Sequence, residues 1–240
     1  EDGIRDLVRS RGLGDVYKRQ DYTMPGMVWG KVLRSPHAHA LIKKIDTSKA
    51  EALQGVLAVM TGADLPTLPL DVPLPTGPND IRWISRGCMA QEKILYVGHP
   101  IAAVAATSQE IAIAALDLIE VDYEVLPHVI DVDEAVAPGA PILHDWIKTG
   151  GIDGPTNISN IMTVKTGDVE KGFGEADLVV ERDFKSAAVH QGYLEPQSCV
   201  VSYKPDSQST IWSSSQGQFM VRGLTATITG MPTGDIKAIQ

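Results

Sequence analysis

Residues 101–126 read IAAVAATSQEIAIAALDLIEVDYEVL, and this stretch decides the fold class. It opens with a short apolar run that is typical of a buried strand. Ser108 is a suitable N-cap for a helix over residues 109–119, where apolar side chains recur on one stripe. Residues 121–126 are rich in β-formers and predict a second strand. A strand, a helix and a strand in close succession predict a compact α+β unit.

The step from this strand to the helix lacks a phosphate-binding glycine motif. The linking residues AATSQE contain no G-x-G-x-x-G pattern, so the unit is not predicted to bind a dinucleotide.

Upstream of this unit the sequence predicts strands over four stretches: 27–34, 41–46, 56–60 and 93–97. We expect the first two to pair as a hairpin, because Ser35-Pro36 between them favours a turn. A short helix is expected from Thr47 or Ser48, ending at Gly55.

Downstream, a region rich in Pro, Gly and Ala marks a domain boundary. We divide the chain into a leader segment that is non-native or disordered (1–20), an α/β domain (21–136), a linker (137–160) and a second domain (161–240). The second domain is predicted to contain a helix over 219–229 and strands at 161–166, 178–187, 197–204, 210–213 and 236–239. No partner strand follows the last one in the sequence, so we expect this domain to be truncated.

Composition excludes several classes of protein. The 240 residues carry 21 Lys and Arg against 30 Asp and Glu, a formal net charge of −9, which argues against nucleic-acid binding. The two cysteines, Cys88 and Cys199, cannot by themselves hold an iron–sulfur cluster or a structural zinc ion. We find no signal peptide and no apolar run long enough to span a membrane, so we expect a cytoplasmic protein with no membrane span, or one in a periplasmic complex.

Two polar segments are candidates for a ligand site: HQGYLEP at 190–196 and WSSSQGQF at 212–219. The second has a glycine-containing turn that opens into a helix, which can offer backbone N–H groups to an anion. Taken alone, its spacing favours an ordinary solvated Gln216 and an ordinary loop Gly217. Glu195 can be a base or pair with Arg222, although a structural hydrogen bond is the simpler interpretation for it and for His190.

Histidines suggest a weaker alternative. His37 and His39 are two residues apart, which would place them on one face of a strand, and with His99 they suggest a metal-dependent hydrolase. No further ligand lies near them in sequence, so ordinary surface histidines are favoured.

Several stretches taken in order resemble one family. Residues 24–66, from MPGMVWGKVLRSPHAHAL onward, and residues 97–135, VGHPIAAVAATSQEIAIAALDLIEVDYEVLPHVIDVDEA, resemble the hammerhead domain of a molybdenum-binding large subunit. The family is that of xanthine dehydrogenase, aldehyde oxidase and carbon monoxide dehydrogenase. HQGYLEP and SSQGQF resemble the opening of its molybdopterin-binding region.

The resemblance implies a site and a reaction. Gln216 matches a glutamine that hydrogen-bonds an oxo-type ligand of the molybdenum, and Gly217 allows the cofactor to approach the backbone. Gln216 is therefore the implied catalytic residue, both residues are implied cofactor contacts, and no side chain is an expected metal ligand. The implied reaction oxidises an aldehyde, N-heterocycle or related carbon centre with water as oxygen source.

The resemblance also implies partners. The cofactor would be molybdopterin, in its cytosine dinucleotide form, with molybdenum. Iron–sulfur clusters and FAD would lie on partner subunits of a hetero-oligomer that acts on a small molecule.

Parts of the family pattern are missing. The glycine-rich cofactor loop and the catalytic glutamate of the family have no match here, so we expect an N-terminal fragment that is inactive alone. Because no nucleophile, base and orienting group can be assembled from the residues, a non-catalytic α+β assembly or interaction domain remains the alternative.

Overall fold

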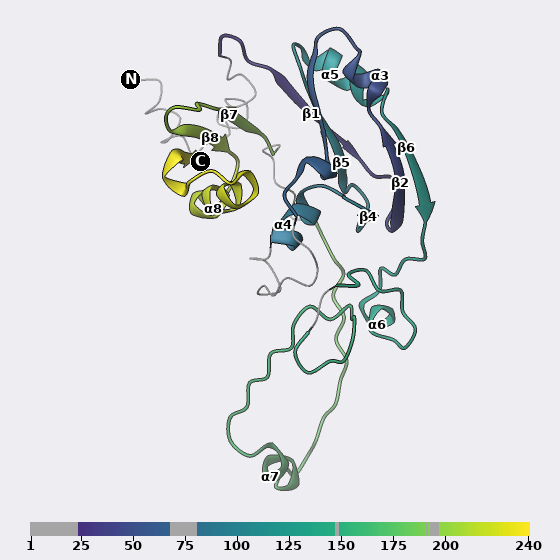
Figure 1. Ribbon diagram of the computed structural model, residues 1–240. Coiled ribbons are helices and arrows are strands. Elements are labelled where there is room, and N and C mark those ends of the chain that lie inside the picture. The colour runs from purple at the N-terminus through teal and green to yellow at the C-terminus, as the bar shows by residue number, and fades with distance from the viewer. Residues whose placement is uncertain (1–23, 68–80, 147–148, 191, 193–196) are drawn as a thin grey trace.

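The computed structural model describes residues 24–67, 81–146, 149–190, 192 and 197–240. These residues form three three-stranded sheets with some of the helices packed against them (Figure 1). The strands are β1 (Trp29–Arg34), β2 (Ala40–Asp46), β3 (Val56–Thr61), β4 (Lys93–Ile94), β5 (Pro100–Ala106), β6 (Glu120–Val125), β7 (Cys199–Ser202), β8 (Ser209–Ser213) and β9 (Ile236–Ile239). The helices are α3 (Ser48–Glu51), α4 (Ile81–Cys88), α5 (Gln109–Leu116), α6 (Val132–Ala135), α7 (Val169–Gly174) and α8 (Gln218–Thr229), with 3₁₀ turns η1 (Gly62–Asp64) and η2 (Thr233–Asp235). The predicted α+β class is confirmed.

The predicted strand–helix–strand unit is present as β5, α5 and β6. Ser108 caps α5 by accepting a hydrogen bond from the Ile111 N–H at 3.2 Å, which explains where the helix begins. Alternate residues of β5 and the inner face of α5 are small and fully buried, so helix and strand pack closely. This packing forms the larger of two core clusters, with β5 at the centre of the sheet β1-β5-β3.

The expected hairpin between residues 27–34 and 41–46 is wrong. β1 pairs with β5, whereas β2 pairs with β4 and β6 in a separate sheet. The residues between them cross from one sheet to the other, and two backbone bonds hold the crossing. The Ser35 N–H donates to the His99 carbonyl at 2.9 Å, and the Gly98 N–H donates to the Ser35 carbonyl at 2.8 Å.

The strand expected over 93–97 is much shorter, because the chain turns after Ile94. The Leu95 N–H donates to His99 Nδ1 at 3.2 Å, so it does not extend the sheet. Helix α4, which the sequence analysis did not predict, precedes this turn and lies against α8. The buried ring of His99 accepts from the Leu95 N–H in this turn and donates to the Arg86 carbonyl of α4, which makes it a structural residue.

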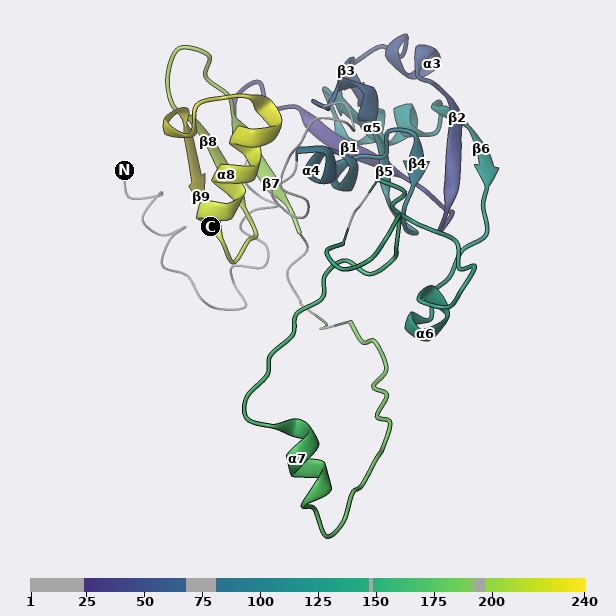
Figure 2. The same cartoon turned by 60° about the horizontal axis from the view of Figure 1, so that its bottom comes forward.

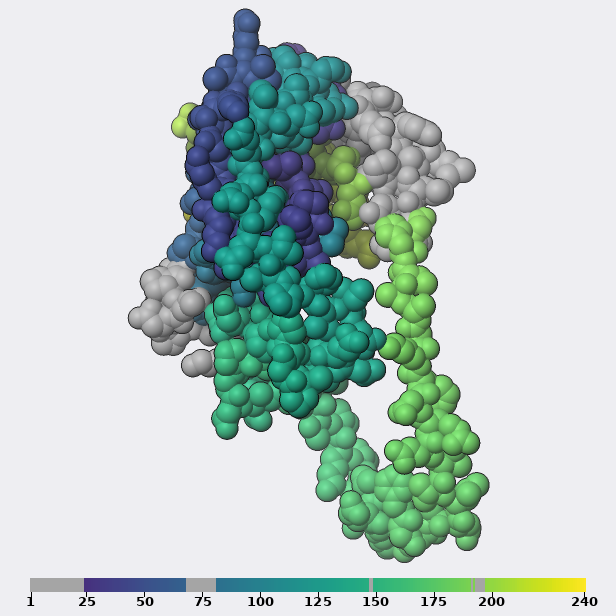
Figure 3. Space-filling model, turned by 90° about the vertical axis from the view of Figure 1, so that its right-hand side faces the viewer, coloured from purple at the N-terminus to yellow at the C-terminus, as the bar shows by residue number. Residues whose placement is uncertain are grey.

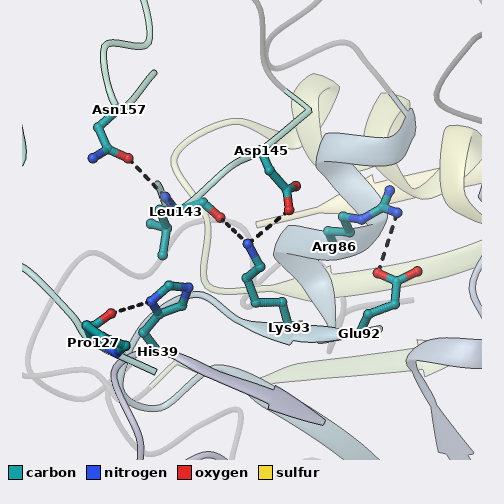
Figure 4. Close-up of polar contacts among 8 residues, drawn as sticks. All are labelled: His39, Arg86, Glu92, Lys93, Pro127, Leu143, Asp145 and Asn157. Atoms are coloured by element: carbon teal, nitrogen blue, oxygen red, sulfur yellow. Dashed lines mark hydrogen bonds and ion pairs between the residues drawn. The ribbon is translucent and has the colours of Figure 1, made fainter. Parts of the chain in front are cut away.

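Residues 137–160, predicted to be a linker, are held against the first domain. Asn157 donates from Nδ2 to the carbonyls of Ala135 and Pro141 at 2.9 and 3.0 Å, and its Oδ1 accepts from the Leu143 N–H at 2.9 Å. Lys93 Nζ donates to the Leu143 carbonyl at 3.2 Å and contacts Asp145 Oδ2 at 3.3 Å (Figure 4). The hydrogen bonds of the Asn157 amide and of the Lys93 amine therefore anchor this segment to the first domain.

Aromatic side chains add to this anchorage. The Trp83 ring on α4 lies 4.8 Å from the His144 ring and 6.2 Å from the Trp146 ring, measured between centroids. The guanidinium of Arg86 lies 5.6 Å from the centre of Trp146, within the range of a cation–π contact.

The strands expected at 161–166 and 178–187 are wrong. Both stretches are extended but unpaired, and with α7 between them they form an arm, residues 159–190, that projects from the molecule (Figures 1, 2 and 3). Every residue of the arm is exposed, including the apolar Met162, Leu178 and Phe184. Both stretches are rich in β-forming residues, but they have no neighbouring strand in the described part of the chain with which to pair.

The third sheet has the order β7-β8-β9. β7 and β8 lie within the stretches predicted as strands or overlap them, and they pair as an antiparallel hairpin. The helix predicted over 219–229 is α8, which ends at Gly230 with a φ of 70°. β9 runs parallel to β8, with α8 as the crossover. The partner of this last strand therefore precedes it in the chain, and the expected truncation of the domain stays a prediction. The expected leader at 1–20 lies outside the described residues.

Candidate functional site

The candidate site is the turn between β8 and α8, at the carboxyl end of a strand that pairs in parallel with β9. β8 ends at Ser213 and α8 begins at Gln218, so Gln216 and Gly217 occupy the connection. Ligands of open sheets with parallel strands bind beyond the carboxyl ends of those strands, next to helix N-termini. The turn is therefore in the part of this sheet where a ligand site is expected.

Gln216 lies exposed in this turn. Its side-chain amide makes no hydrogen bond to the residues that the structure describes. An amide carries two N–H donors and adds no charge, so it can donate to an electronegative group of a ligand. The Gln216 amide is therefore suited to donate a hydrogen bond to a ligand of a metal centre without adding charge there.

Gly217 is the N-cap of α8, with φ −143° and ψ 80°. Its N–H donates to Ser215 Oγ at 3.1 Å. A Cβ placed at Gly217 would lie 3.6 Å from the Cβ of Met220, an ordinary contact, so neither its torsion nor packing within the described chain requires glycine. The expected close approach of a cofactor at this residue remains a prediction.

The start of α8 is suited to an anion. The helix has no side-chain cap and no acidic residue in its first turn, so its first N–H groups face no competing carboxylate there. The donor chemistry of this turn, with the neutral amide and the helix start together, fits an anionic cofactor that carries its own metal.

Two nearby polar residues are engaged elsewhere. Gln218 donates from Nε2 to Oε1 of Gln240 at 2.6 Å, which joins the start of α8 to the end of β9. Arg222 donates from Nε to the carbonyl of Thr233 at 2.7 Å and so fixes η2 to α8. Glu195, its expected partner, lies outside the described residues.

His190 lies exposed at the end of the arm, where its Nδ1 accepts a hydrogen bond from the Gly192 N–H at 3.0 Å. The remaining residues of the HQGYLEP motif, apart from Gly192, are outside the described part of the chain. The structure therefore gives His190 a local backbone contact, and the role of Glu195 as a base or as a partner of Arg222 stays a prediction.

Ser214 is a residue of this site that the sequence analysis missed. Its hydroxyl accepts from the Ser198 N–H at 3.0 Å and donates to the Ser198 carbonyl at 3.2 Å. A run of serines at the end of a predicted strand does not by itself indicate this contact, because the sequence does not reveal which residue lies opposite Ser214.

The histidine alternative is wrong in its geometry. His37 and His39 lie in the crossing between β1 and β2, not on a strand. His37 packs edge-on against Tyr123, with ring centroids 4.9 Å apart, and His39 Nδ1 lies 2.6 Å from the Pro127 carbonyl (Figure 4).

His99 has a separate structural role, since its Nε2 donates to the Arg86 carbonyl at 2.7 Å and burial lowers its pKa below the usual 6.5. Among the described residues, no group of three His, Cys, Asp or Glu side chains is placed to hold a metal ion. The described helices also include none that is long and apolar enough to cross a membrane.

Comparison with known proteins identifies both halves of the chain. Residues 14–127 match the family model "Aldehyde oxidase and xanthine dehydrogenase, a/b hammerhead domain". Residues 152–240 match the model "Molybdopterin cofactor-binding domain". The two matches follow one another in the order that the sequence resemblance implied.

Individual relatives agree with these matches. The chain is 37% identical to the carbon monoxide dehydrogenase large chain of Afipia carboxidovorans, over 98% of this chain and 29% of the relative. It is 34% identical to a probable xanthine dehydrogenase subunit of Bacillus subtilis, again over 98% of this chain and 29% of the relative. The chain thus spans less than a third of the length of these relatives.

Solved structures share the fold. A crystal structure of Cu,Mo-CO dehydrogenase superposes with a TM-score of 0.74 at 32% identity, covering 97% of this chain and 30% of that one. Quinoline 2-oxidoreductase from Pseudomonas putida 86 also gives a TM-score of 0.74, at 26% identity, covering 99% of this chain and 29% of that one.

Proposed function

This chain belongs to the xanthine dehydrogenase, aldehyde oxidase and carbon monoxide dehydrogenase family of molybdenum-dependent oxidoreductases, and we propose that it forms part of the catalytic large subunit of a molybdenum hydroxylase. The observation that carries the proposal is the order of two matched domains, a hammerhead domain followed by a molybdopterin-binding domain. The reaction proposed for the whole subunit is oxidation of an aldehyde, N-heterocycle or related carbon centre, with water as oxygen source.

Within that subunit Gln216 is the proposed donor toward the metal centre. When bound, the molybdenum cofactor supplies the two-electron oxidant of the reaction. The Gln216 amide donates a hydrogen bond toward the cofactor without adding charge, and such outer contacts orient and tune a metal site. Its support is its exposure in the β8–α8 turn together with the motif that it shares with the family.

The start of α8 and Gly217 are proposed to face the anionic part of the cofactor. Support comes from the first turn of the helix, which has no side-chain cap and no acidic residue. The cytosine dinucleotide form of molybdopterin extends this proposal, because a dinucleotide brings further phosphate for such N–H groups to bind.

Electrons from the reaction are proposed to leave through iron–sulfur clusters to FAD on partner subunits, in a cytoplasmic hetero-oligomer. With two cysteines in 240 residues, the chain has too few thiolates to hold such a cluster alone. The names of the relatives, a large chain and a subunit, support a complex of several chains.

The test compares Gln216→Ala with Gln218→Ala in the assembled enzyme, using molybdenum content and turnover of carbon monoxide, xanthine, quinoline and an aliphatic aldehyde. We expect Gln216→Ala to lower turnover roughly 10- to 100-fold, as is usual when an outer contact of a metal is removed. Gln218→Ala is the matched control, because that side chain is bonded to Gln240.

Two results would count against the proposal. Equal turnover by both variants would remove Gln216 from the site. A complex without molybdenum would favour the alternative of a non-catalytic assembly domain. The 240-residue chain by itself serves as the baseline, and we expect it to show no turnover.

A further inference from the structure

The hydroxyl of Ser214 replaces a backbone group at the point where β8 leaves its sheet. The Ser214 N–H donates to the Ser198 carbonyl at 3.2 Å, as in an ordinary antiparallel pair. The Ser198 N–H, however, donates to Ser214 Oγ at 3.0 Å, and this hydroxyl donates to the Ser198 carbonyl at 3.2 Å. A side-chain oxygen thus takes the position that a carbonyl would have in a regular ladder.

This replacement fixes the start of the turn. The last regular pair of the hairpin joins Cys199 and Ser213. Because the Ser214 hydroxyl already satisfies the Ser198 N–H, the Ser214 carbonyl is not needed for the ladder, and the backbone can turn at once toward Gln216. Ser215 continues the turn by accepting the Gly217 N–H at 3.1 Å.

We propose that Ser214 is a positioning residue for Gln216, because its bonds to Ser198 determine where the turn that carries the Gln216 amide begins. This inference rests on the proposed function of Gln216 as a donor to the cofactor. In sequence, Ser198 follows the HQGYLEP motif with only Gln197 between them, so the hydroxyl bonds the Gln216 turn to a residue two positions after that motif.

The chain provides a matched control at the opposite end of the same hairpin. Ser209 Oγ accepts from the Lys204 N–H at 3.0 Å and donates to the Lys204 carbonyl at 3.4 Å. These two hydrogen bonds have the same donor and acceptor groups as those between Ser214 and Ser198. They lie at the other end of β8, so their loss affects the hairpin without changing where the Gln216 turn begins.

The first measurement does not depend on turnover. Amide hydrogen exchange is followed at Ser198 and across residues 214–217 in the assembled enzyme and its variants. Ser214→Ala is expected to accelerate exchange at Ser198 about fivefold or more, because one net hydrogen bond is lost and the donor has no other acceptor among the described residues. Ser214→Thr keeps the hydroxyl and is expected to restore the wild-type rate, and Ser209→Ala is expected to leave Ser198 unchanged.

The second measurement uses the assembled enzyme and separates positioning from stability. Ser214→Ala is expected to lower kcat about tenfold while molybdenum content and KM stay at wild-type values, with rescue by Ser214→Thr. Ser209→Ala is expected to keep kcat within about twofold. If Ser214→Ala does not fold, Ser214→Cys repeats the comparison, since sulfur is a weak acceptor of similar size.

The outcomes are distinct. Unchanged exchange at Ser198 in Ser214→Ala, or an equal loss of kcat in Ser209→Ala, would overturn the positioning role. If Gln216→Ala instead shows normal turnover, the proposed function of Gln216 fails, and a positioning role for its neighbour fails with it even when exchange at Ser198 changes.

Discussion

At the scale of single residues, Gly62 in the first domain is under a tight steric constraint. A Cβ built on Gly62 would lie 2.1 Å from the carbonyl oxygen of Ala90, a backbone atom that cannot move away cheaply. Ala90 is fully buried, and its N–H donates to the Pro100 carbonyl at 2.8 Å. Gly62 is therefore required by a close approach of two backbone segments, not by its torsion angles.

We predict that Gly62→Ala lowers the free energy of unfolding by about 1–3 kcal/mol, the usual cost of forcing extra volume into a packed site. Gly87→Ala is the control, because a Cβ added at this position in α4 would meet no atom of the described residues within 4 Å and alanine favours helix. Urea unfolding followed by circular dichroism measures both variants. Equal stability of Gly62→Ala and wild type would show that the backbone contact at Ala90 relaxes.

The contact of Ser214 with Ser198 is an example of an interaction that could not be predicted from the sequence. The family motif was enough to select Gln216 and Gly217, since those residues are recognised by type and spacing. The hydroxyl of Ser214 acts through Ser198, and which residue lies opposite it depends on the register between β7 and β8.

At the scale of elements, local patterns were predicted well and long-range pairing was not. The cap of α5 and the end of α8 follow from neighbouring residues, so both helices were predicted close to their observed bounds. The partners of β1 and β2 lie far along the chain, and a turn between them looks the same whether it closes a hairpin or crosses between sheets. Helix α4 is short and was missed.

The arm at 159–190 leads to a prediction about proteolysis. Its residues are exposed and, outside α7, lack backbone pairing, which makes them good protease substrates. Among described sites, trypsin should cut first after Lys165 and Arg182, and much later after Lys43, which lies within the paired strand β2. Lys185 should be cut more slowly than Arg182, because it contacts Asp131 at 2.7 Å.

Mass spectrometry of a timed digest gives the order of cleavage. Early cleavage within β2 at the same rate as in the arm would contradict the structure. The Asp131→Asn variant weakens the contact with Lys185 and should make that site as sensitive as Arg182.

At the scale of the whole molecule, the hydrophobic core is concentrated in the first domain. Both core clusters are built from residues between Trp29 and Tyr123. The arm, in contrast, exposes large apolar side chains such as Phe184, which is 93% exposed. The described chain therefore combines a packed domain with a region that has not buried its own apolar surface.

We predict that residues 24–160, expressed alone, unfold cooperatively in urea, because they contain both clusters and the anchored segment up to Asn157. Residues 161–240 alone should bind a hydrophobic dye and show no cooperative transition. Circular dichroism and dye fluorescence measure the two fragments. A non-cooperative first fragment would mean that its core depends on contacts from the second domain.

The contacts of Asn157 have a consequence for modular design. Segments between domains are the usual places to insert a reporter or to join a domain to another protein, and composition alone would suggest residues 137–160 for this purpose. Asn157 closes a ring back to Ala135, Pro141 and Leu143, so an insertion within that ring would break it open. A suitable insertion site lies just beyond it, at residues 159–160. A fusion there would leave the hammerhead domain and the hydrogen bonds of Asn157 intact, so that they could be transferred together.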